Sequence, residues 1–210
     1  MPTITSDPRV LVLASNNAGK LAELQAMFAP LGVSLRRQSD LGVSEADEPF
    51  RTFVENALAK ARHASQATGL PAVADDAGLC VQAFGGQPGV DTAYYATRFG
   101  YPKGDAYNVK ALLEHMQGVV DRRAALVSTL VAVRSHDDPE PLVATGRVAG
   151  LVTEQPVGDG GFGFDPVMFI PALRQTFAQL PPDVKNRYSH RGRAAEAMVA
   201  LMRERWYGSN

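Results

Sequence analysis

Cysteine, net charge and long apolar runs are the features that this chain has least of. Its 210 residues include a single cysteine, Cys80, so an intramolecular disulfide framework is excluded. No stretch approaches the roughly 18 apolar residues that span a bilayer, and residues 1–9 lack the basic and apolar regions of a secretory signal. We therefore expect a soluble, cytoplasmic protein without a membrane partner.

The charge balance limits the kind of partner. Lys and Arg number 21 and Asp and Glu number 22, which gives a formal net charge of −1. Such a chain has no electrostatic basis for non-specific binding to nucleic acid, and a small-molecule partner fits better. The hydrophobic fraction of 45% is ordinary for a globular protein. We expect residues 1–210 to form a single domain, with residues 1–8 as a flexible N-terminal tail.

Short apolar runs alternate with segments of helical periodicity, which is typical of an α/β fold. The run Val10–Ala14 predicts a strand buried on both faces, and apolar residues then recur at helical spacing from Leu21 to Phe28. Further predicted strands are Val33–Arg37, Pro71–Ala74, Arg123–Arg134 and Leu142–Val152, and further predicted helices are Thr52–Thr68, Asp105–Met116 and Ser189–Arg205. The two long strands would form an antiparallel hairpin that contributes to a smaller lobe. We expect a mixed central sheet flanked by helices.

The first predicted strand is followed by a polar turn suited to phosphate. Ligands of open α/β sheets lie at the carboxyl ends of strands, where helix N-termini offer free N–H groups. Lys20 adds a positive charge, and glycine lets the backbone approach closely. The turn consists of Ser15, Asn16, Asn17, Ala18, Gly19 and Lys20. Its spacing is not that of a Walker motif, and a turn that only caps a helix explains it equally well.

Two carboxylates follow the strand Pro71–Ala74 directly. Asp75 and Asp76 at a strand end are suited to Mg²⁺, which takes one or two carboxylates and completes its shell with water and phosphate. Because consecutive strand residues point to opposite faces, only one of the two should enter the site fully. Asp47, Glu48 and Glu55 are candidates to complete it. The alternative is a pair of aspartates that only form a turn before a glycine.

A second group of candidates lies late in the chain. The run Gly160 to Asp165 combines flexible backbone with the rings of Phe162 and Phe164, as in a wall on which a nucleobase stacks. Lys185 and the predicted helix start Ser189-His190-Arg191 offer donors for phosphate or for a base carbonyl. A hairpin turn with core aromatics and an exposed basic helix start are the alternatives.

Read in order, these segments resemble the inosine/xanthosine triphosphate pyrophosphatase family over nearly the whole chain. The matching blocks are Ala14–Lys20, Phe53–Ala57, Ala74–Leu79, Gly160–Pro166 and Ser189–Gly192. The family hydrolyses deaminated purine triphosphates, which keeps them out of nucleic acids. The resemblance implies an active-site cleft between two lobes, a Mg²⁺ cofactor and a homodimer.

The resemblance also implies a role for each candidate residue. Asp76 would be the proton acceptor and a metal ligand, and Glu48 a second metal ligand. Ser15 to Lys20 and Lys185 would hold the triphosphate, while Phe162, Gly163, Phe164 and Asp165, with His190 and Arg191, would enclose the base. The sequence departs from the family at two positions: Ala77 replaces a common serine that contacts substrate, and Phe164 replaces the usual tyrosine. Each change removes one hydroxyl.

The implied reaction releases pyrophosphate from dITP, ITP, XTP or dXTP and leaves the nucleoside monophosphate. Two other functions remain open from the residues. The chain could be a nucleotide-binding regulatory module without turnover, or a pyrophosphatase for other modified triphosphates.

Overall fold

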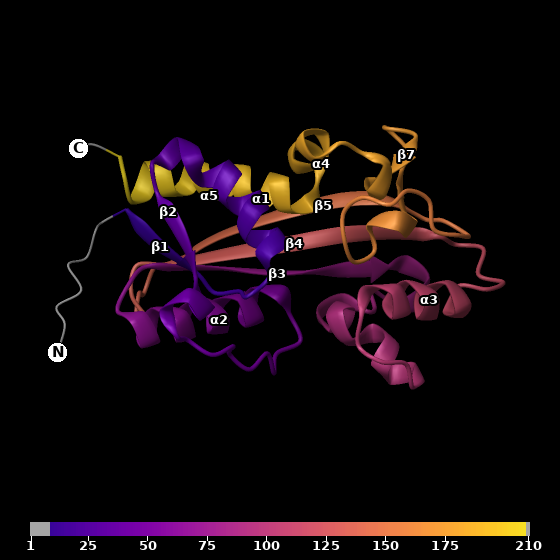
Figure 1. Cartoon of the computed structure of the whole chain (residues 1–210), viewed down its shortest axis with the longest axis horizontal. Coiled ribbons are helices and arrows are strands. Elements are labelled where there is room, and N and C mark those ends of the chain that lie inside the picture. Colours follow the sequence, from indigo (N-terminus) through magenta and orange to yellow (C-terminus); the bar gives the residue numbers. More distant parts are fainter. Residues whose placement is uncertain (1–8, 209–210) are drawn as a thin grey trace. The chain divides into compact units, whose positions relative to one another are not determined.

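The computed structural model describes residues 9–208, and within them the strands form one seven-stranded sheet of order β2-β1-β3-β4-β5-β6-β7 (Figure 1). Strand β1 pairs in parallel with β2 and β3, whereas β6 pairs antiparallel with β5 and β7. The predicted α/β fold with a mixed central sheet is therefore confirmed. The strands are β1 (Val10–Leu13), β2 (Ser34–Arg37), β3 (Ala72–Val81), β4 (Arg123–Val133), β5 (Leu142–Val152), β6 (Met168–Ile170) and β7 (Gln175–Thr176).

The α-helices agree with the sequence pattern, with one addition. Helix α4 was not predicted, although Pro182 at its first position after Pro181 is a typical start signal. No helix within residues 9–208 combines the length and the apolar character needed to cross a membrane. The α-helices are α1 (Ala18–Phe28), α2 (Phe53–Thr68), α3 (Asp105–His115), α4 (Pro182–Tyr188) and α5 (His190–Arg205).

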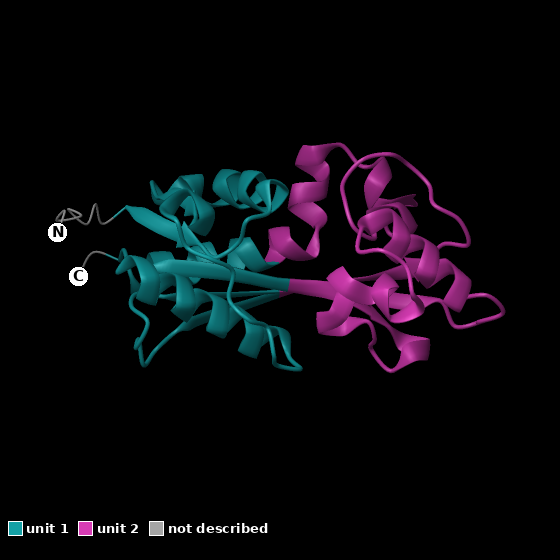
Figure 2. Ribbon diagram, turned by 60° about the horizontal axis from the view of Figure 1, so that its bottom comes forward, with its two compact units in different colours: residues 1–76, 129–145, 194–210 teal, residues 77–128, 146–193 magenta. Residues whose placement is uncertain are grey.

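The chain divides into two compact units, coloured separately in Figure 2. Unit 1 contains the described parts of residues 1–76, 129–145 and 194–210, and unit 2 contains residues 77–128 and 146–193. Strands β3, β4 and β5 contribute residues to both units, so the hairpin of β4 and β5 is not confined to a smaller lobe as expected. The single domain over residues 1–210 stays a prediction, and the predicted tail, residues 1–8, lies outside the described residues.

In unit 1 the sheet is buried on both faces because the side chains of β1 alternate between two apolar clusters. Leu13 packs in one cluster with Leu24 of α1 and with residues of α5, and Val12 packs in the other with Ala61 of α2. Helices α1 and α5 thus cover one face and α2 covers the other (Figure 1). This two-sided burial explains why the strand reads as a continuous apolar run.

Unit 2 has its own apolar cluster. Tyr95, Leu112 of α3 and Phe177 are almost fully buried in it, together with Leu79 and Phe164. This packing fixes α3 to the strands and loops of unit 2 and holds its N-terminal turn in place.

One expectation about β3 was wrong. The aspartates were predicted to follow the end of the strand, but β3 runs from Ala72 through Asp75 and Asp76 to Val81. The strand tolerates the two carboxylates because each pairs with a lysine. The reading of this pair as turn-forming residues is also excluded.

Candidate active site

The turn between β1 and α1 caps the helix. Asn17 is the N-cap, and its side-chain oxygen accepts a hydrogen bond from the Lys20 N–H at 3.0 Å. The Ser15 hydroxyl accepts one from the Asn17 N–H at 3.2 Å. The capping interpretation is therefore correct, but it does not compete with phosphate binding. Ala18 and Gly19 lie in the first helical turn, where N–H groups have no acceptor within the helix and can meet an anion.

Lys20 reaches from this turn to Asp75 on β3. Its Nζ lies 3.1 Å from Asp75 Oδ2 and donates to the Asp75 backbone carbonyl at 3.2 Å. The Asp75 side chain is fully buried, whereas the Lys20 side chain is 18% exposed. The buried carboxylate thus holds a partly accessible ammonium in place at the start of α1.

Asp76 points to the opposite face of the sheet, toward α2. There Lys60 Nζ lies 2.8 Å from Asp76 Oδ1 and 2.9 Å from Glu48 Oε2. One ammonium therefore joins the two residues predicted to bind metal. The prediction that only one aspartate of the pair would join this group is consistent with the geometry, since Asp75 turns to Lys20 instead.

Lys60 was missed in the sequence analysis, although a signal was present. It follows Asn56 by four residues and precedes Ala64 by four, and both neighbours are buried. Residues at this spacing share one helix face. A lysine on the inner face of a helix needs a buried anion, and Asp76 was the nearest candidate.

The pKa values of the three groups depend on one another. Burial raises the pKa of Asp76 to about 6, the nearby Glu48 carboxylate adds to the rise, and Lys60 opposes it. Burial also acts on Glu48, but the Lys60 ammonium outweighs it and leaves the pKa of Glu48 below its ordinary value. Burial works against the ammonium of Lys60, yet the two carboxylates raise its pKa. A carboxylate with a pKa near neutrality is suited to accept a proton during a reaction.

The donor set around Asp76 fits a hard divalent cation. The buried Oδ2 atom of Asp76 accepts no hydrogen bond from the described residues. Carboxylate oxygens are the protein ligands that Mg²⁺ prefers, and the ion completes its shell with water and phosphate. Across residues 9–208 no three His, Cys, Asp or Glu side chains form a ready cluster for a metal. Glu48 and Asp76 are the carboxylates that could supply ligands to such an ion.

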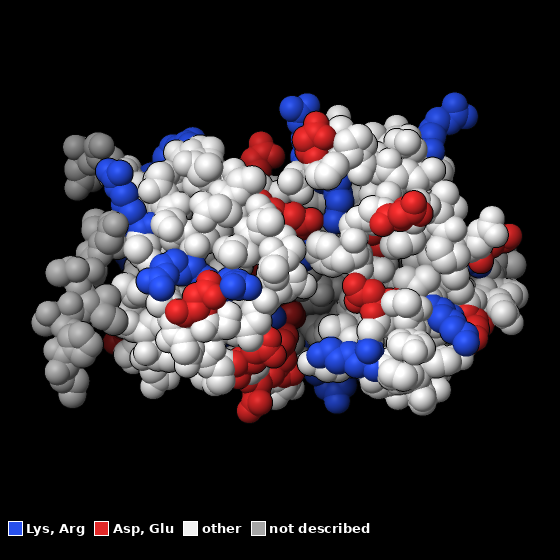
Figure 3. All heavy atoms as spheres, viewed as in Figure 1, with Lys and Arg blue, Asp and Glu red and all other residues white. Residues whose placement is uncertain are grey.

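The other acidic candidates take different roles. Glu55 pairs with Thr52 at the N-terminus of α2, where the Thr52 hydroxyl also accepts the Glu55 N–H. The Asn16 amide donates to Glu45 at 3.1 Å. Asp47 is exposed in the loop between β2 and α2, beside which acidic side chains gather in Figure 3. Of the acidic candidates proposed to complete the site, only Glu48 is joined to Asp76 by a lysine.

In unit 2 a second group forms around Phe162. Lys185 Nζ lies 2.8 Å from Asp165 Oδ2 and 4.5 Å from the centroid of the Phe162 ring. The Arg191 guanidinium lies 5.4 Å from the same centroid. The structure thus brings together an aromatic ring, a carboxylate and two cations, which lie 23 and 29 residues after Phe162 in the sequence.

The junction of α4 and α5 places these cations. The Ser189 hydroxyl accepts the Gly192 N–H at 2.9 Å, as expected of an N-cap at the predicted helix start. A Cβ atom on Gly192 would lie 1.7 Å from the Asn186 carbonyl oxygen, so only glycine permits this close approach. His190 is buried, with its ring centroid 6.4 Å from that of Phe177.

The two positions that depart from the family are both shielded. Phe164 is buried in the apolar cluster of unit 2, so its ring serves packing there. Ala77 is half-buried on β3.

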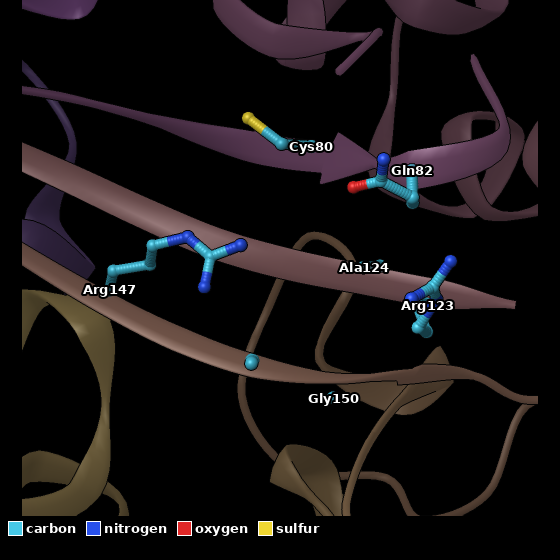
Figure 4. Close-up of a pocket in the computed structure, with 7 residues that line it drawn as sticks. Cys80, Gln82, Arg123, Ala124, Arg147 and Gly150 are labelled. Carbon is cyan, nitrogen blue, oxygen red and sulfur yellow. The ribbon is translucent and has the colours of Figure 1, made fainter. Parts of the chain in front are cut away.

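A pocket of 240 Å³ on the sheet of unit 2 is lined by none of the predicted site residues, and Figure 4 shows Cys80, Arg123 and Arg147 around it. Burial raises the pKa of the Cys80 thiol, with Arg147 opposing the rise.

Comparison with known proteins identifies the class to which this arrangement belongs. The family model described as the Ham1 family matches residues 11–201, and the chain belongs to this family. A protein of Paracidovorax citrulli named dITP/XTP pyrophosphatase is 76% identical over 197 residues, which cover 94% of this chain and 99% of that protein. A protein of the same name from Leptothrix cholodnii is 56% identical over 94% of this chain and 98% of its own length.

Solved structures agree in fold. The structure of a HAM1 protein from Coxiella burnetii matches with a TM-score of 0.86 and 38% identity, over 93% of this chain and 98% of that one. A nucleoside-triphosphatase / dITP/XTP pyrophosphatase from Mycobacterium abscessus matches with a TM-score of 0.71 and 37% identity, over 92% of this chain and 98% of that one. The predicted family membership is thereby confirmed.

Proposed function

We propose that this chain hydrolyses deaminated purine nucleoside triphosphates such as dITP and XTP to the nucleoside monophosphate and pyrophosphate. The observation that carries the proposal is the pair of carboxylates, Glu48 and Asp76, held by Lys60 in the same unit as the turn Ser15 to Lys20. Relatives that match almost the full chain are named for this activity.

The polar residues of unit 1 would bind the reacting end of the substrate. Ser15 to Lys20 would hold phosphate through the N–H groups in the first turn of α1 and the Lys20 ammonium. Lys185 would also hold phosphate, as the family resemblance implies. Glu48 and Asp76 would hold a divalent cation, for which we propose Mg²⁺. When bound, this ion would supply neutralisation of phosphate charge and polarisation of the scissile bond.

Asp76 would act as the proton acceptor. A water molecule attacks the α-phosphorus and a new P–O bond forms, while the bond from that phosphorus to the α–β bridging oxygen breaks. The proton of the water passes to Asp76, and the bridging oxygen leaves with pyrophosphate. Burial, which raises the pKa of Asp76 in the metal-free protein to about 6, makes this carboxylate a stronger base than an exposed aspartate.

The residues of unit 2 would select the base. Phe162 offers a ring for stacking, and His190 and Arg191 carry donors suited to a 6-oxo group, which adenine lacks. Phe164 and Ala77 cannot supply the hydroxyls of the usual tyrosine and serine. We propose that this removes one or two polar contacts and leaves the reaction intact.

Pyrophosphate release from dITP tests the assignment of Asp76. Asp76→Asn keeps the size of the side chain but removes the base and one anionic ligand, so release should fall by more than about a hundredfold. Asp137→Asn, at an exposed position of the turn between β4 and β5, is the matched control and should keep wild-type activity. Full activity of Asp76→Asn with an unchanged melting temperature would reject the assignment.

A panel of triphosphates separates the remaining possibilities. We expect dITP and XTP to have a far higher kcat/KM than dATP, because adenine lacks the 6-oxo group. Binding without Mg²⁺-dependent pyrophosphate release would point to a regulatory module, and preference for a modified pyrimidine would reassign the substrate.

We also propose that the chain acts in the cytoplasm as a homodimer, as its family resemblance implies. Light scattering on the protein as it elutes from a size-exclusion column should give twice the 22.5 kDa mass of one chain. A monomeric mass at the concentrations of the activity assay would reject the dimer.

A further inference from the structure

The loop that carries Phe162 is glycine-rich because it lies against other parts of unit 2. The Gly160 N–H donates to the Ala178 carbonyl at 3.0 Å, and a Cβ atom on Gly158 or Gly160 would lie 2.8 Å from the Ala178 backbone. Gly161 and Gly163 have φ values of +74° and +61°, which favour glycine. The glycines therefore fit a defined conformation and do not indicate a mobile segment.

Two carboxylates hold the tip of this loop through consecutive N–H groups. The Phe162 N–H donates to Asp165 Oδ2 at 2.9 Å, and the Gly163 N–H donates to Asp105 Oδ2 at 2.8 Å. Asp165 is local, but Asp105 lies 58 residues away in sequence. Asp165 also pairs with Lys185 of α4, whereas Asp105 joins the tip of the loop to α3.

Asp105 is firmly supported. It is in the first turn of α3, whose inner face is buried through Leu112 and neighbouring residues in the cluster of unit 2. Asn108, one turn later, is itself buried and holds the Ala96 N–H at 2.8 Å. The backbone from which the Asp105 carboxylate extends is therefore held in place. The helix dipole also stabilises a negative charge at the N-terminus of α3.

We propose that Asp105 is a positioning residue for substrate, which sets the orientation of the Phe162 ring by fixing the Gly163 N–H. This inference rests on the proposed function, in which Phe162 stacks on the base. Because Asp105 contacts the loop that carries Phe162, its effect should fall on binding of the base. Loss of the tie should raise KM for dITP and change kcat by less than twofold.

Asp105→Ala and Asp105→Asn form the test. The alanine variant removes the acceptor, and we expect KM for dITP to rise about fivefold, the loss associated with one partly exposed hydrogen bond. The asparagine variant keeps an acceptor oxygen at the same place and should restore KM to within about twofold of wild type. Melting temperatures of both variants report whether α3 and the fold are intact.

Hydrogen exchange at the Gly163 amide, followed by NMR in the substrate-free protein, provides a readout that does not depend on turnover. We expect faster exchange in Asp105→Ala and near wild-type exchange in Asp105→Asn. Unchanged exchange in the alanine variant would reject the tie, and faster exchange with an unchanged KM would reject its role in substrate binding. Absence of turnover in the wild-type protein would reject the proposed function, whereas the exchange data would still decide whether the tie exists.

Discussion

Lys60 donates a hydrogen bond to Asp76 at 2.8 Å from the inner face of α2, and the same ammonium contacts Glu48. A lysine thus occupies the place between two carboxylates where a divalent cation would be expected. Its side chain is only 11% exposed, so the three groups are coupled in a weakly hydrated environment. This relationship makes a prediction about metal binding that does not depend on catalysis.

Lys60→Met should make the folded protein more dependent on Mg²⁺. The substitution leaves Glu48 and Asp76 without the ammonium, which should lower stability by about 2 kcal/mol at neutral pH because a buried charge loses its partner. Added Mg²⁺ should then raise the melting temperature of the variant more than that of wild type, because the ion would relieve the repulsion between the Glu48 and Asp76 carboxylates that Lys60 relieves in wild type. Thermal unfolding followed across a Mg²⁺ titration measures this. Lys103→Met, at an exposed site, is the control, and equal Mg²⁺ effects in all three proteins would contradict the two-carboxylate site.

The Lys20–Asp75 pair predicts an asymmetry between its two partners. Lys20→Met deprives a fully buried carboxylate of this cation, whereas Asp75→Asn deprives an ammonium that can still reach water. The lysine substitution should therefore cost more stability, about 3 kcal/mol against about 1 kcal/mol. Chemical denaturation of both variants at pH 7 compares them. A larger loss in Asp75→Asn would show that the carboxylate supports more of the structure than its pairing with Lys20.

Sequence patterns predicted the elements of this fold well where apolar periodicity was strong. Val10–Ala14 and the helix at Thr52–Thr68 agree with β1 and α2 to within one residue. The end of β3 was predicted wrongly because polar residues usually mark a strand end, and here Asp75 and Asp76 are neutralised by lysines from other segments. A pairing between distant residues cannot be read from local pattern.

Pairings between distant residues also limited what the sequence could predict about the site. Residue types made Asp75, Asp76, Asp47, Glu48 and Glu55 candidates, and the family resemblance implied Asp76 and Glu48 among them. The structure joins these two through Lys60. Lys60 itself was overlooked because the other residues on the inner face of α2 are mostly alanine, which indicates packing and not a charged site. Asp105 gave no signal at all, because its partner is a backbone N–H of Gly163 and backbone partners leave no trace in side-chain chemistry.

Stability should fall in acid partly through Asp138. Arg134 donates to both of its carboxylate oxygens and lowers its pKa, with the backbone N–H groups of Arg134 and Glu140 as further donors. A depressed folded pKa contributes stability above the unfolded value of about 3.9, and this stability is lost as the pH falls toward the folded pKa. Asp138→Asn should cost about 2 kcal/mol at pH 7 and clearly less near pH 2, where part of the ionic contribution is already lost. Urea denaturation at both pH values measures it, and an equal cost at both would contradict the ionic origin.

Two glycines of the Phe162 loop should respond differently to alanine. A Cβ atom on Gly161 would lie 2.1 Å from Asp165 Oδ2, whereas one on Gly163 would meet nothing within 4 Å. Both have positive φ, so each substitution carries about 1 kcal/mol of backbone strain. Gly161→Ala must in addition displace the carboxylate that holds the Phe162 N–H and Lys185.

We therefore expect Gly161→Ala to raise KM for dITP by more than about tenfold and Gly163→Ala by less than about threefold. The difference corresponds to about 1 kcal/mol or more of binding energy that only Gly161→Ala loses. Steady-state kinetics on the two variants, with melting temperatures to confirm folding, measure the difference. Because both substitutions add the same methyl group to the same loop, the backbone strain is matched between them. An equal rise in KM would mean that strain alone disturbs the base site and that the place of the Asp165 carboxylate is unimportant for binding.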